Sequence, residues 1–253
     1  MSIIVTPAVL NIRPYIVCCL VKNLNFNKNN AFKKFIALQT KFHDTICDKR
    51  QAATIATHDM NLVKSPLTYD AKVPSHIKIT PLFAKEELTA QSLVANLRRE
   101  ADEIRKEKKR NKLSGIHKYL DLLHEKPEYP CLVDKEGCVI SFPPITNSDK
   151  TKISKDTTSL LIEVTSSRSL HICKEVMDTL LQEMLNMGIG ERLSGKKAET
   201  PGSEPEESNT NDKYKITVQQ VNVINQDNSL RVVYPSRTDL NSDLIQVTYD
   251  CDE

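Results

Sequence analysis

Three polar residues follow a pair of consecutive prolines, and together they form the first candidate for a binding site. Pro143 and Pro144 fix φ and supply no backbone donor, so the chain is expected to leave a sheet there in extended form. Asn147, Ser148 and Asp149 come next, and side chains of these types bind nearby backbone and shape tight loops. Rigid polar loops after buried strands often carry binding sites. A structured turn without a ligand explains the same residues, so both interpretations stay open.

A run of cations near residue 110 is a second candidate, for contacts with phosphate. The helix predicted over 85–112 interleaves acids and bases and then ends in the unbalanced cations Lys108, Lys109, Arg110 and Lys112. The helix dipole stabilises cations at a C-terminus, which explains the run without a ligand. Binding of RNA phosphates is the alternative. Because the net charge is only +2, any affinity for nucleic acid must come from a local patch of this kind.

Metal and nucleophile chemistry have little support in the sequence. Cys131 and Cys138 lack paired histidines, and His43 with Cys47 supplies only two ligands, so no zinc site is predicted. The His-Asp pair at 58–59 could act as a base and its orienter, but no serine or cysteine nucleophile is tied to it. The chain has six glycines and no phosphate-binding glycine loop. Aminoacylation is therefore unsupported, and no cofactor is expected.

Composition is typical of a soluble protein. The 253 residues can bury one core with a small satellite. The seven cysteines show no disulfide spacing, so reduced thiols and a cytoplasmic location are expected. The longest clean apolar run, Ile16–Val21, is too short to span a bilayer, and no secretory signal is recognised. With no tryptophan and 5% aromatic residues, base stacking is a poor candidate for the main contribution to RNA binding.

Hydrophobic periodicity predicts an α+β fold, with a mixed, mainly antiparallel sheet and covering helices. Helices are predicted over 31–49, 85–112, 115–124 and 169–187. Strands are predicted over 53–57, 76–81, 131–133, 138–142 and 159–164. The apolar stripe of the last helix is interpreted as core.

The two ends of the chain are predicted to differ from this central part. Residues 1–30 are predicted as an irregular N-terminal segment, and residues 31–190 as the main module. Residues 191–213, rich in Glu, Ser, Pro and Asn, are predicted as a disordered linker. Residues 214–253 are predicted as a C-terminal β-hairpin and tail, with the hairpin turn at 226–229.

Several short segments, taken in order, resemble one family. Pro143–Asn147 reads Pro-Pro-Ile-Thr-Asn, and Glu163–Thr165 reads Glu-Val-Thr. Both are similar to hallmarks of the B3/B4 module in the β subunit of eukaryotic and archaeal phenylalanyl-tRNA synthetase. Segments within 41–78 also resemble the lead-in to that module. The resemblance covers the chain from Lys41 to Met187 and implies a B3/B4-like fold.

Two stretches are most similar to leucine-rich-repeat proteins that carry this module at their C-terminal end. These stretches are Ile140–Ser148 and Val232–Ser236. No repeating leucine pattern is found in the sequence, and residues 1–30 do not resemble the family. A shortened chain is therefore expected.

The resemblance implies a particular pocket. In phenylalanyl-tRNA synthetase, the B3/B4 module hydrolyses tRNA that is mischarged with tyrosine. The implied editing pocket lies among Pro144, Asn147, Ser148, Glu163 and Thr165. Glu163 would accept a hydrogen bond from the tyrosine hydroxyl, and Asn147 and Ser148 would hold water or the ribose end.

One departure from the family pattern bears on editing. The family continues Glu-x-Thr-Gly-Thr-Asp, whereas this sequence has Ser166 in place of the glycine and Arg168 in place of the acid. A guanidinium in place of a carboxylate reverses a charge and should change nearby pKa values and the placement of water. The exchange argues against editing, and it supplies a cation that can hold a phosphate.

Three hypotheses for function follow. The favoured one is a non-catalytic, translation-associated module that binds tRNA or another RNA, with translation proteins as further partners. Its predicted RNA contacts are Lys108, Lys109, Arg110, Lys112 and Arg168. The second is hydrolysis of mischarged tyrosyl-tRNA in the pocket described above. The third is a protein-binding adaptor that acts through residues 188–253. None of the three requires a metal, a cofactor or a membrane.

Overall fold

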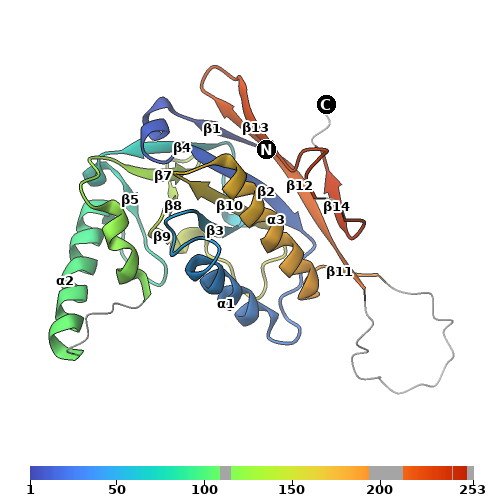
Figure 1. Ribbon diagram of the computed structural model, residues 1–253, viewed down its shortest axis with the longest axis horizontal. Helices are drawn as coiled ribbons and strands as arrows, with labels where there is room; N and C mark the ends of the chain where they lie inside the picture. Colours follow the sequence, from blue (N-terminus) through green and yellow to red (C-terminus); the bar gives the residue numbers. More distant parts are fainter. Residues whose placement is uncertain (109–114, 194–212, 241, 250–253) are drawn as a thin grey trace.

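The main feature of the fold is a twelve-stranded mixed sheet, seen in a computed structural model that describes residues 1–108, 115–193, 213–240 and 242–249 (Figure 1). The strands follow the order β3-β10-β2-β12-β1-β4-β7-β8-β9. Their bounds are β1 (Ser2–Val5), β2 (Tyr15–Lys22), β3 (Thr54–Asp59), β4 (Leu67–Lys72), β7 (Tyr129–Val133), β8 (Val139–Phe142), β9 (Thr146–Asn147), β10 (Leu160–Ser166) and β12 (Tyr214–Asn225). Three more strands pair with β12, namely β11 (Glu191–Arg192), β13 (Leu230–Tyr234) and β14 (Ile245–Thr248).

The sheet is mostly antiparallel and nearly closes into a barrel. Parallel pairing is found where β1 meets β12 and β4, and where β14 meets β12. The outermost strands of the order, β3 and β9, approach each other, and the Asn147 side-chain amide donates to the Thr57 carbonyl oxygen at 3.4 Å. The predicted α+β class with a mainly antiparallel sheet is confirmed.

Helices pack on the outside of this sheet in two groups. α1 (Ala31–Asp44) and α3 (Leu170–Asn186) cover β10, β2 and β3, and Figure 1 shows α3 running across β10 and β2. α2 (Ala90–Lys108) and the 3₁₀ helix η4 (Gly115–Leu123) form a separate core with β5 (Lys78–Ile79), β7 and β8. β6 (Leu88–Thr89) pairs with β5. The short 3₁₀ turns are η1 (Pro7–Asn11), η2 (Met60–Leu62), η3 (Pro74–His76) and η5 (Asp149–Thr151).

The helix α3 begins and packs as its sequence predicts. The Ile172 backbone N–H donates to the Ser169 hydroxyl at 3.2 Å, which satisfies one of the free donors at the helix start. Its apolar stripe is buried against the sheet, which confirms the interpretation as core. The buried members are Cys173, Val176, Met177, Leu180, Leu181, Met184 and Leu185.

Strand β10 brings functional candidates to the barrel interior. It lies between β2 and β3 and is buried along its whole length. Leu160, Ile162 and Val164 belong to the core under α1 and α3, whereas Leu161 belongs to the core inside the barrel. Because side chains alternate between faces of a strand, residues 163 and 165 also face inward.

The prediction that residues 1–30 are irregular is wrong. β1 pairs with β4 and β12, and β2 lies between β10 and β12. In β2, Cys18 faces the barrel interior and Cys19 faces α3, so adjacent cysteines point apart. A strand covered on both faces gives a continuous apolar run, which lacks the alternation that identifies a half-buried strand.

The predicted C-terminal hairpin is confirmed, but it is not separate from the main sheet. β12 and β13 pair antiparallel, and β12 also lies between β1 and β2. β14 was not predicted. At the start of the predicted linker, β11 pairs with β12, so Glu191 and Arg192 are not disordered. Residues 194–212 of the predicted linker lie outside the described residues.

The double proline does not lead the chain out of the sheet. The Ile145 backbone N–H donates to the Phe142 carbonyl oxygen at 2.8 Å, and the Pro143–Pro144 peptide bond is cis. β9 then returns antiparallel to β8. The expected extended exit is wrong, because the donor that the prolines lack is supplied by the residue after them.

Candidate binding cavity

A cavity of about 1280 Å³ opens between α1, β3, η4 and the double-proline turn. It lies at the seam where β3 and β9 nearly close the barrel. Most of its wall is apolar or aromatic, including Phe26, Phe32, Ile55, Tyr119, Phe142 and Ile145. Small-molecule sites usually measure roughly 300–1,000 Å³, so the space suits a ligand larger than an amino acid.

Only some of the residues implied as a pocket line this cavity. Pro144, Asn147 and Glu163 do so. Ser148 is buried, and its hydroxyl accepts from the Lys150 backbone N–H at 3.2 Å, which caps η5. Thr165 is also buried and bonds to Arg13. The structure thus brings three of the five together and places the other two in supporting bonds.

Glu163 is a buried carboxylate with one oxygen unused. The Ser141 hydroxyl donates to its Oε1 at 2.5 Å, whereas Oε2 has no hydrogen-bond partner among the described residues. Burial raises the pKa of the Glu163 carboxyl to about 7. Near neutral pH the group can therefore either donate a hydrogen bond to a ligand or accept one.

His58 lies next to Glu163 but does not bond to it. Its Nε2 is 4.0 Å from the Glu163 Oε2, and its Nδ1 is 2.9 Å from the Thr151 hydroxyl. Burial lowers the pKa of His58 to about 3. The imidazole is therefore neutral at neutral pH, and the pair is not an ion pair.

Gln39 adds a second unused polar group to the cavity wall. The Thr57 hydroxyl donates to the Gln39 Oε1 at 3.2 Å, while the Gln39 Nε2 has no partner among the described residues. Sequence reasoning missed this residue. The available signal was its place on the apolar side of the helix, four residues after Phe35 and three before Phe42.

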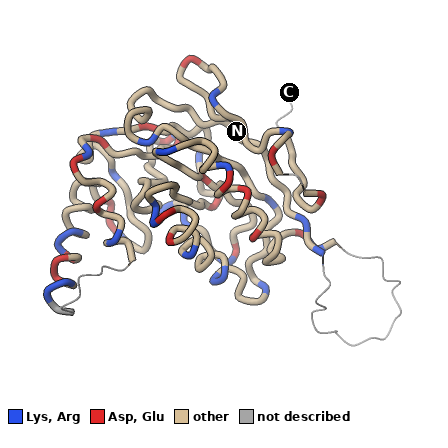
Figure 2. The backbone as a smooth tube through the Cα atoms, viewed as in Figure 1, with Lys and Arg blue, Asp and Glu red and all other residues tan. Residues whose placement is uncertain are grey.

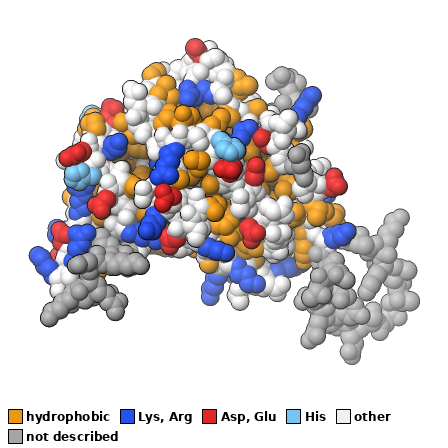
Figure 3. All heavy atoms as spheres, viewed as in Figure 1, with side chains coloured by type: hydrophobic (Ala, Val, Ile, Leu, Met, Phe, Trp, Pro, Cys, Tyr) orange, Lys and Arg blue, Asp and Glu red, His pale blue; other side chains and the backbone are white. Residues whose placement is uncertain are grey.

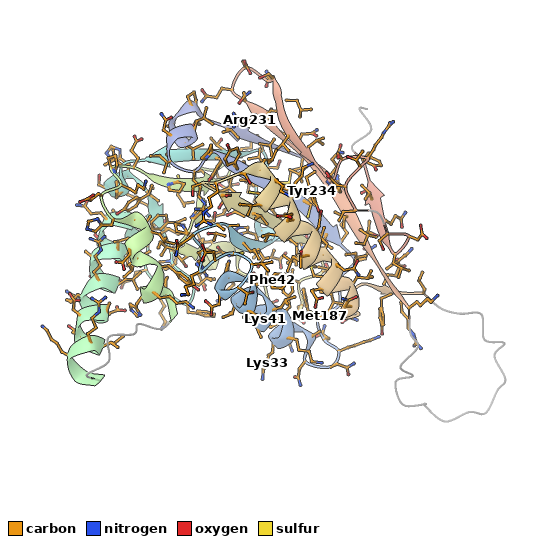
Figure 4. The ribbon with its side chains drawn as sticks, in the orientation of Figure 1. Lys33, Lys41, Phe42, Met187, Arg231 and Tyr234 are labelled. Atoms are coloured by element: carbon orange, nitrogen blue, oxygen red, sulfur yellow. The ribbon has the colours of Figure 1, made fainter. Side chains whose placement is uncertain are left out.

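Cations surround the mouth of the cavity. Lys118 bonds to Asp44, and Lys152 pairs with Asp149 at 2.9 Å. Lys33 and Lys155 are exposed and form no ion pair with any described residue. Figure 4 shows Lys33 on α1, at the lower edge of the molecule. The mouth can therefore attract an anionic ligand.

Arg50 holds the double-proline turn against η4. Its Nη1 donates to the carbonyl oxygens of Pro144 and Ile145 at 2.7 and 2.8 Å. Its guanidinium carbon lies 4.3 Å from the centre of the Tyr119 ring. The planar group thus bonds and stacks at once, which lysine cannot reproduce.

Replacing Arg50 with lysine is expected to lower the free energy of unfolding by about 1–2 kcal/mol, because one charge-assisted hydrogen bond and the stacking contact are lost. Urea denaturation measures the change. Lys49→Ala is the matched control, since this neighbour is exposed and should change little. Equal stability of Arg50→Lys and the wild type would contradict a role for the guanidinium.

The structure describes only two of the predicted RNA contacts, Lys108 and Arg168. Lys108 ends α2, and Lys109, Arg110 and Lys112 lie outside the described residues. Figure 2 shows acids and bases interleaved along the rest of α2. Arg168 pairs with Asp48 at 3.0 Å and does not line the cavity. The residue at which the charge is reversed, Arg168, is therefore not part of the cavity wall.

The described residues offer neither a metal site nor a membrane span. No group of three or more His, Cys, Asp or Glu side chains suited to a metal ion occurs in this part of the chain. No helix there has the length and hydropathy needed to cross a membrane.

Comparisons with known proteins point to one family, although no protein-family model matches the chain. The human phenylalanine–tRNA ligase β subunit is 36% identical over 166 residues, which is 66% of this chain and 26% of the relative. The Drosophila melanogaster β subunit is 33% identical over 70% of this chain and 28% of the relative. The archaeal β subunit of Methanosphaera stadtmanae is 34% identical over 62% of this chain and 25% of the relative.

A solved structure shares the fold. It is an N-terminal fragment of the phenylalanyl-tRNA synthetase β subunit from Pyrococcus horikoshii, with a TM-score of 0.67 and 24% identity over 93% of this chain and 54% of that one. Because the match covers 93% of the chain, it includes part of residues 1–30, and that part shares the fold. The predicted likeness to leucine-rich-repeat proteins is not tested by these relatives and stays a prediction. This chain, which spans about a quarter of the curated relatives it matches, is a homologue of the phenylalanine–tRNA ligase β subunit with a B3/B4-like domain.

Proposed function

We propose that this chain is a translation-associated module that binds tRNA and takes its aminoacyl end into the cavity beside Glu163. The observation that carries the proposal is the unused Glu163 oxygen in a large cavity of a chain related to tRNA ligase subunits. tRNA and translation proteins are the partners proposed, in the cytoplasm. Aminoacylation by this chain is not part of the proposal.

The chemistry of the cavity supports this ligand class. Apolar and aromatic walls suit an amino-acid side chain, and Glu163 and Gln39 can bind its polar groups or the ribose hydroxyls. Lysines at the mouth suit the phosphates of the terminal nucleotides. The cations Lys108, Lys109, Arg110 and Lys112 are proposed to contact the tRNA backbone. Arg168 is proposed as a weaker contact, because Asp48 already partly neutralises it.

Removing the unpaired mouth lysines is expected to weaken tRNA binding and its salt dependence. In the double variant Lys33→Ala/Lys155→Ala, two lost phosphate contacts should lower the slope of log affinity against log salt by about 1.5–2. Filter binding at several salt concentrations measures it. The triple variant Lys108→Ala/Lys109→Ala/Arg110→Ala tests the proposed contacts of these cations in the same way.

The matched control is Lys64→Ala/Lys135→Ala, two exposed lysines that do not line the cavity. This control should bind like the wild type. If the wild type binds no tRNA at physiological salt, the proposed function is wrong. If only the triple variant loses affinity, the backbone contacts stand, but the cavity mouth is not a phosphate site.

Hydrolysis of mischarged tRNA is a second candidate. The Glu163 carboxyl favours hydrolysis, because burial raises its pKa to about 7. Arg168 does not line the cavity, so its positive charge does not oppose hydrolysis there. Incubation with tyrosyl-tRNA specific for phenylalanine tests it. Release of tyrosine no faster than in buffer would reject hydrolysis and leave the binding proposal intact.

A further inference from the structure

Phe83 is an exposed aromatic side chain at the mouth of the cavity. It is 87% exposed and belongs to the cavity lining. Its φ of +67° lies in the left-handed region, which bulky side chains rarely adopt. Backbone outliers of this kind concentrate at functional sites, where the surrounding structure holds them in place.

Hydrogen bonds fix the backbone on both sides of this ring. The Phe83 N–H donates to the Asp149 carboxylate at 2.9 Å. The Leu82 N–H donates to the Asn147 carbonyl oxygen at 3.2 Å, and the Ala84 N–H to that of Pro81 at 2.9 Å. The ring is therefore presented to solvent from an anchored loop, next to the residues that follow the double-proline turn.

Cations lie beside the exposed ring. The Lys152 ammonium is 5.8 Å from the ring centre, and it also pairs with Asp149. Lys155 is exposed on the same rim, and Lys150 pairs with Glu87 at 3.0 Å. On the face shown in Figure 3, acidic and basic side chains are similarly interspersed. Asp149 and Glu87 partly neutralise Lys152 and Lys150, so Lys155, which forms no ion pair with a described residue, is the cation left for a polyanion. Protein interfaces have cores depleted in charge, so an exposed ring in this charged setting fits a polyanion better than a protein partner.

We propose that Phe83 is a stacking platform for an unpaired base at the 3′ end of tRNA. Binding of single strands combines an aromatic face for a base with cations for the backbone, and both meet here at the entrance of the cavity. The inference rests on the proposed tRNA binding and adds a residue to it. One well-placed ring can contribute even though the aromatic content of the chain is low.

The chain has no tryptophan, so Phe83→Trp introduces a single fluorescent reporter at the site. Titration with intact tRNA is expected to quench its fluorescence, because a stacked base quenches indole. tRNA that lacks its unpaired 3′ nucleotides should not quench it. Leu230→Trp is the control reporter, since Leu230 is 61% exposed on β13 and does not line the cavity.

Affinity gives a second readout. Phe83→Ala is expected to weaken binding of intact tRNA by about tenfold and to leave binding of the shortened tRNA unchanged, whereas Phe83→Tyr should bind like the wild type. Far-ultraviolet circular dichroism checks that the variants fold. Normal tRNA affinity of Phe83→Ala, with no quenching in Phe83→Trp, would overturn the stacking role and leave tRNA binding standing. Absence of any tRNA binding by the wild type would overturn both the stacking role and the proposed function. Quenching of the Phe83→Trp fluorescence by a peptide but not by tRNA would assign the ring to a protein partner.

Discussion

Replacing Glu163 with glutamine is expected to make the protein more stable above neutral pH while weakening its binding of ligand. The wild-type carboxyl is buried, and burial raises its pKa from 4.5 to about 7. Glutamine has nearly the same shape and still accepts from the Ser141 hydroxyl, but it has no charge to desolvate. The variant therefore separates the effect of the carboxylate on folding stability from its effect on ligand binding.

The direction of the pH dependence follows from proton uptake. Between pH 4.5 and 7 the folded protein holds a proton on Glu163 that the unfolded protein has lost, so this group makes stability fall as pH rises. Above pH 7 the full cost is present, and the difference between 4.5 and about 7 corresponds to about 3 kcal/mol. Glu163→Gln should be more stable than the wild type by up to that amount at pH 8, and similar to it at pH 4.

Urea denaturation at a series of pH values measures this difference. Glu87→Gln is a matched control, because Glu87 is partly exposed and pairs with Lys150, so its effect should stay below about 1 kcal/mol. In both variants, His58 and His43 should still lower stability in acid. Burial lowers the pKa of each to about 3, so stability falls as pH drops below about 6.5.

The same variant tests the use of the carboxylate. If a ligand hydroxyl bonds to the free oxygen, Glu163→Gln should weaken binding of aminoacylated tRNA by about tenfold, because a hydrogen bond to a charged group is lost. Binding of tRNA without an amino acid should change less. A variant that gains stability and keeps full affinity for both would show that the carboxylate is not used for binding.

The sequence predicts the parts of the fold that have one clear period. The apolar stripe of α3 was recognisable, and so was the buried run of β10. β2 was missed because burial on both faces removes the alternation. The tail strand β14 was missed because it is short and pairs in parallel with β12, across the intervening β13, and strand formation depends on such neighbours more than on local preference.

The candidate site shows the same division. A sequence motif identifies Asn147 and Glu163, but it does not say which neighbouring side chains share their cavity. Gln39 lies on a helix and Phe83 on a loop, and each is more than 60 residues from Asn147 and Glu163 in the sequence. Only folding brings them to the wall of the same cavity. Ser148 directly follows Asn147, and Thr165 lies two residues after Glu163, yet the two hydroxyls bond to η5 and to Arg13.

Thr165 is expected to stabilise the fold because it accepts hydrogen bonds from Arg13. This arginine is buried, and burial lowers the pKa of its guanidinium. It donates to the Thr165 hydroxyl at 2.8 Å, to the Thr165 carbonyl oxygen at 2.8 Å and to the Thr54 hydroxyl at 2.9 Å. Arg13 forms no ion pair with a carboxylate among the described residues. A buried cation of this kind depends on neutral acceptors, so the loss of any one of them should lower stability.

Thr165→Val is therefore expected to lower the free energy of unfolding by about 2 kcal/mol, since it removes one acceptor from a buried charge and keeps the side-chain shape. Thr165→Ser keeps the hydroxyl and should cost less than about 1 kcal/mol. Chemical denaturation measures both, and tRNA affinity below the unfolding transition should match the wild type in each. If Thr165→Val has normal stability and lowered tRNA affinity, Thr165 acts in binding and not in stabilising the barrel. The hydrogen bond from Arg13 would then make no measurable contribution to holding β10.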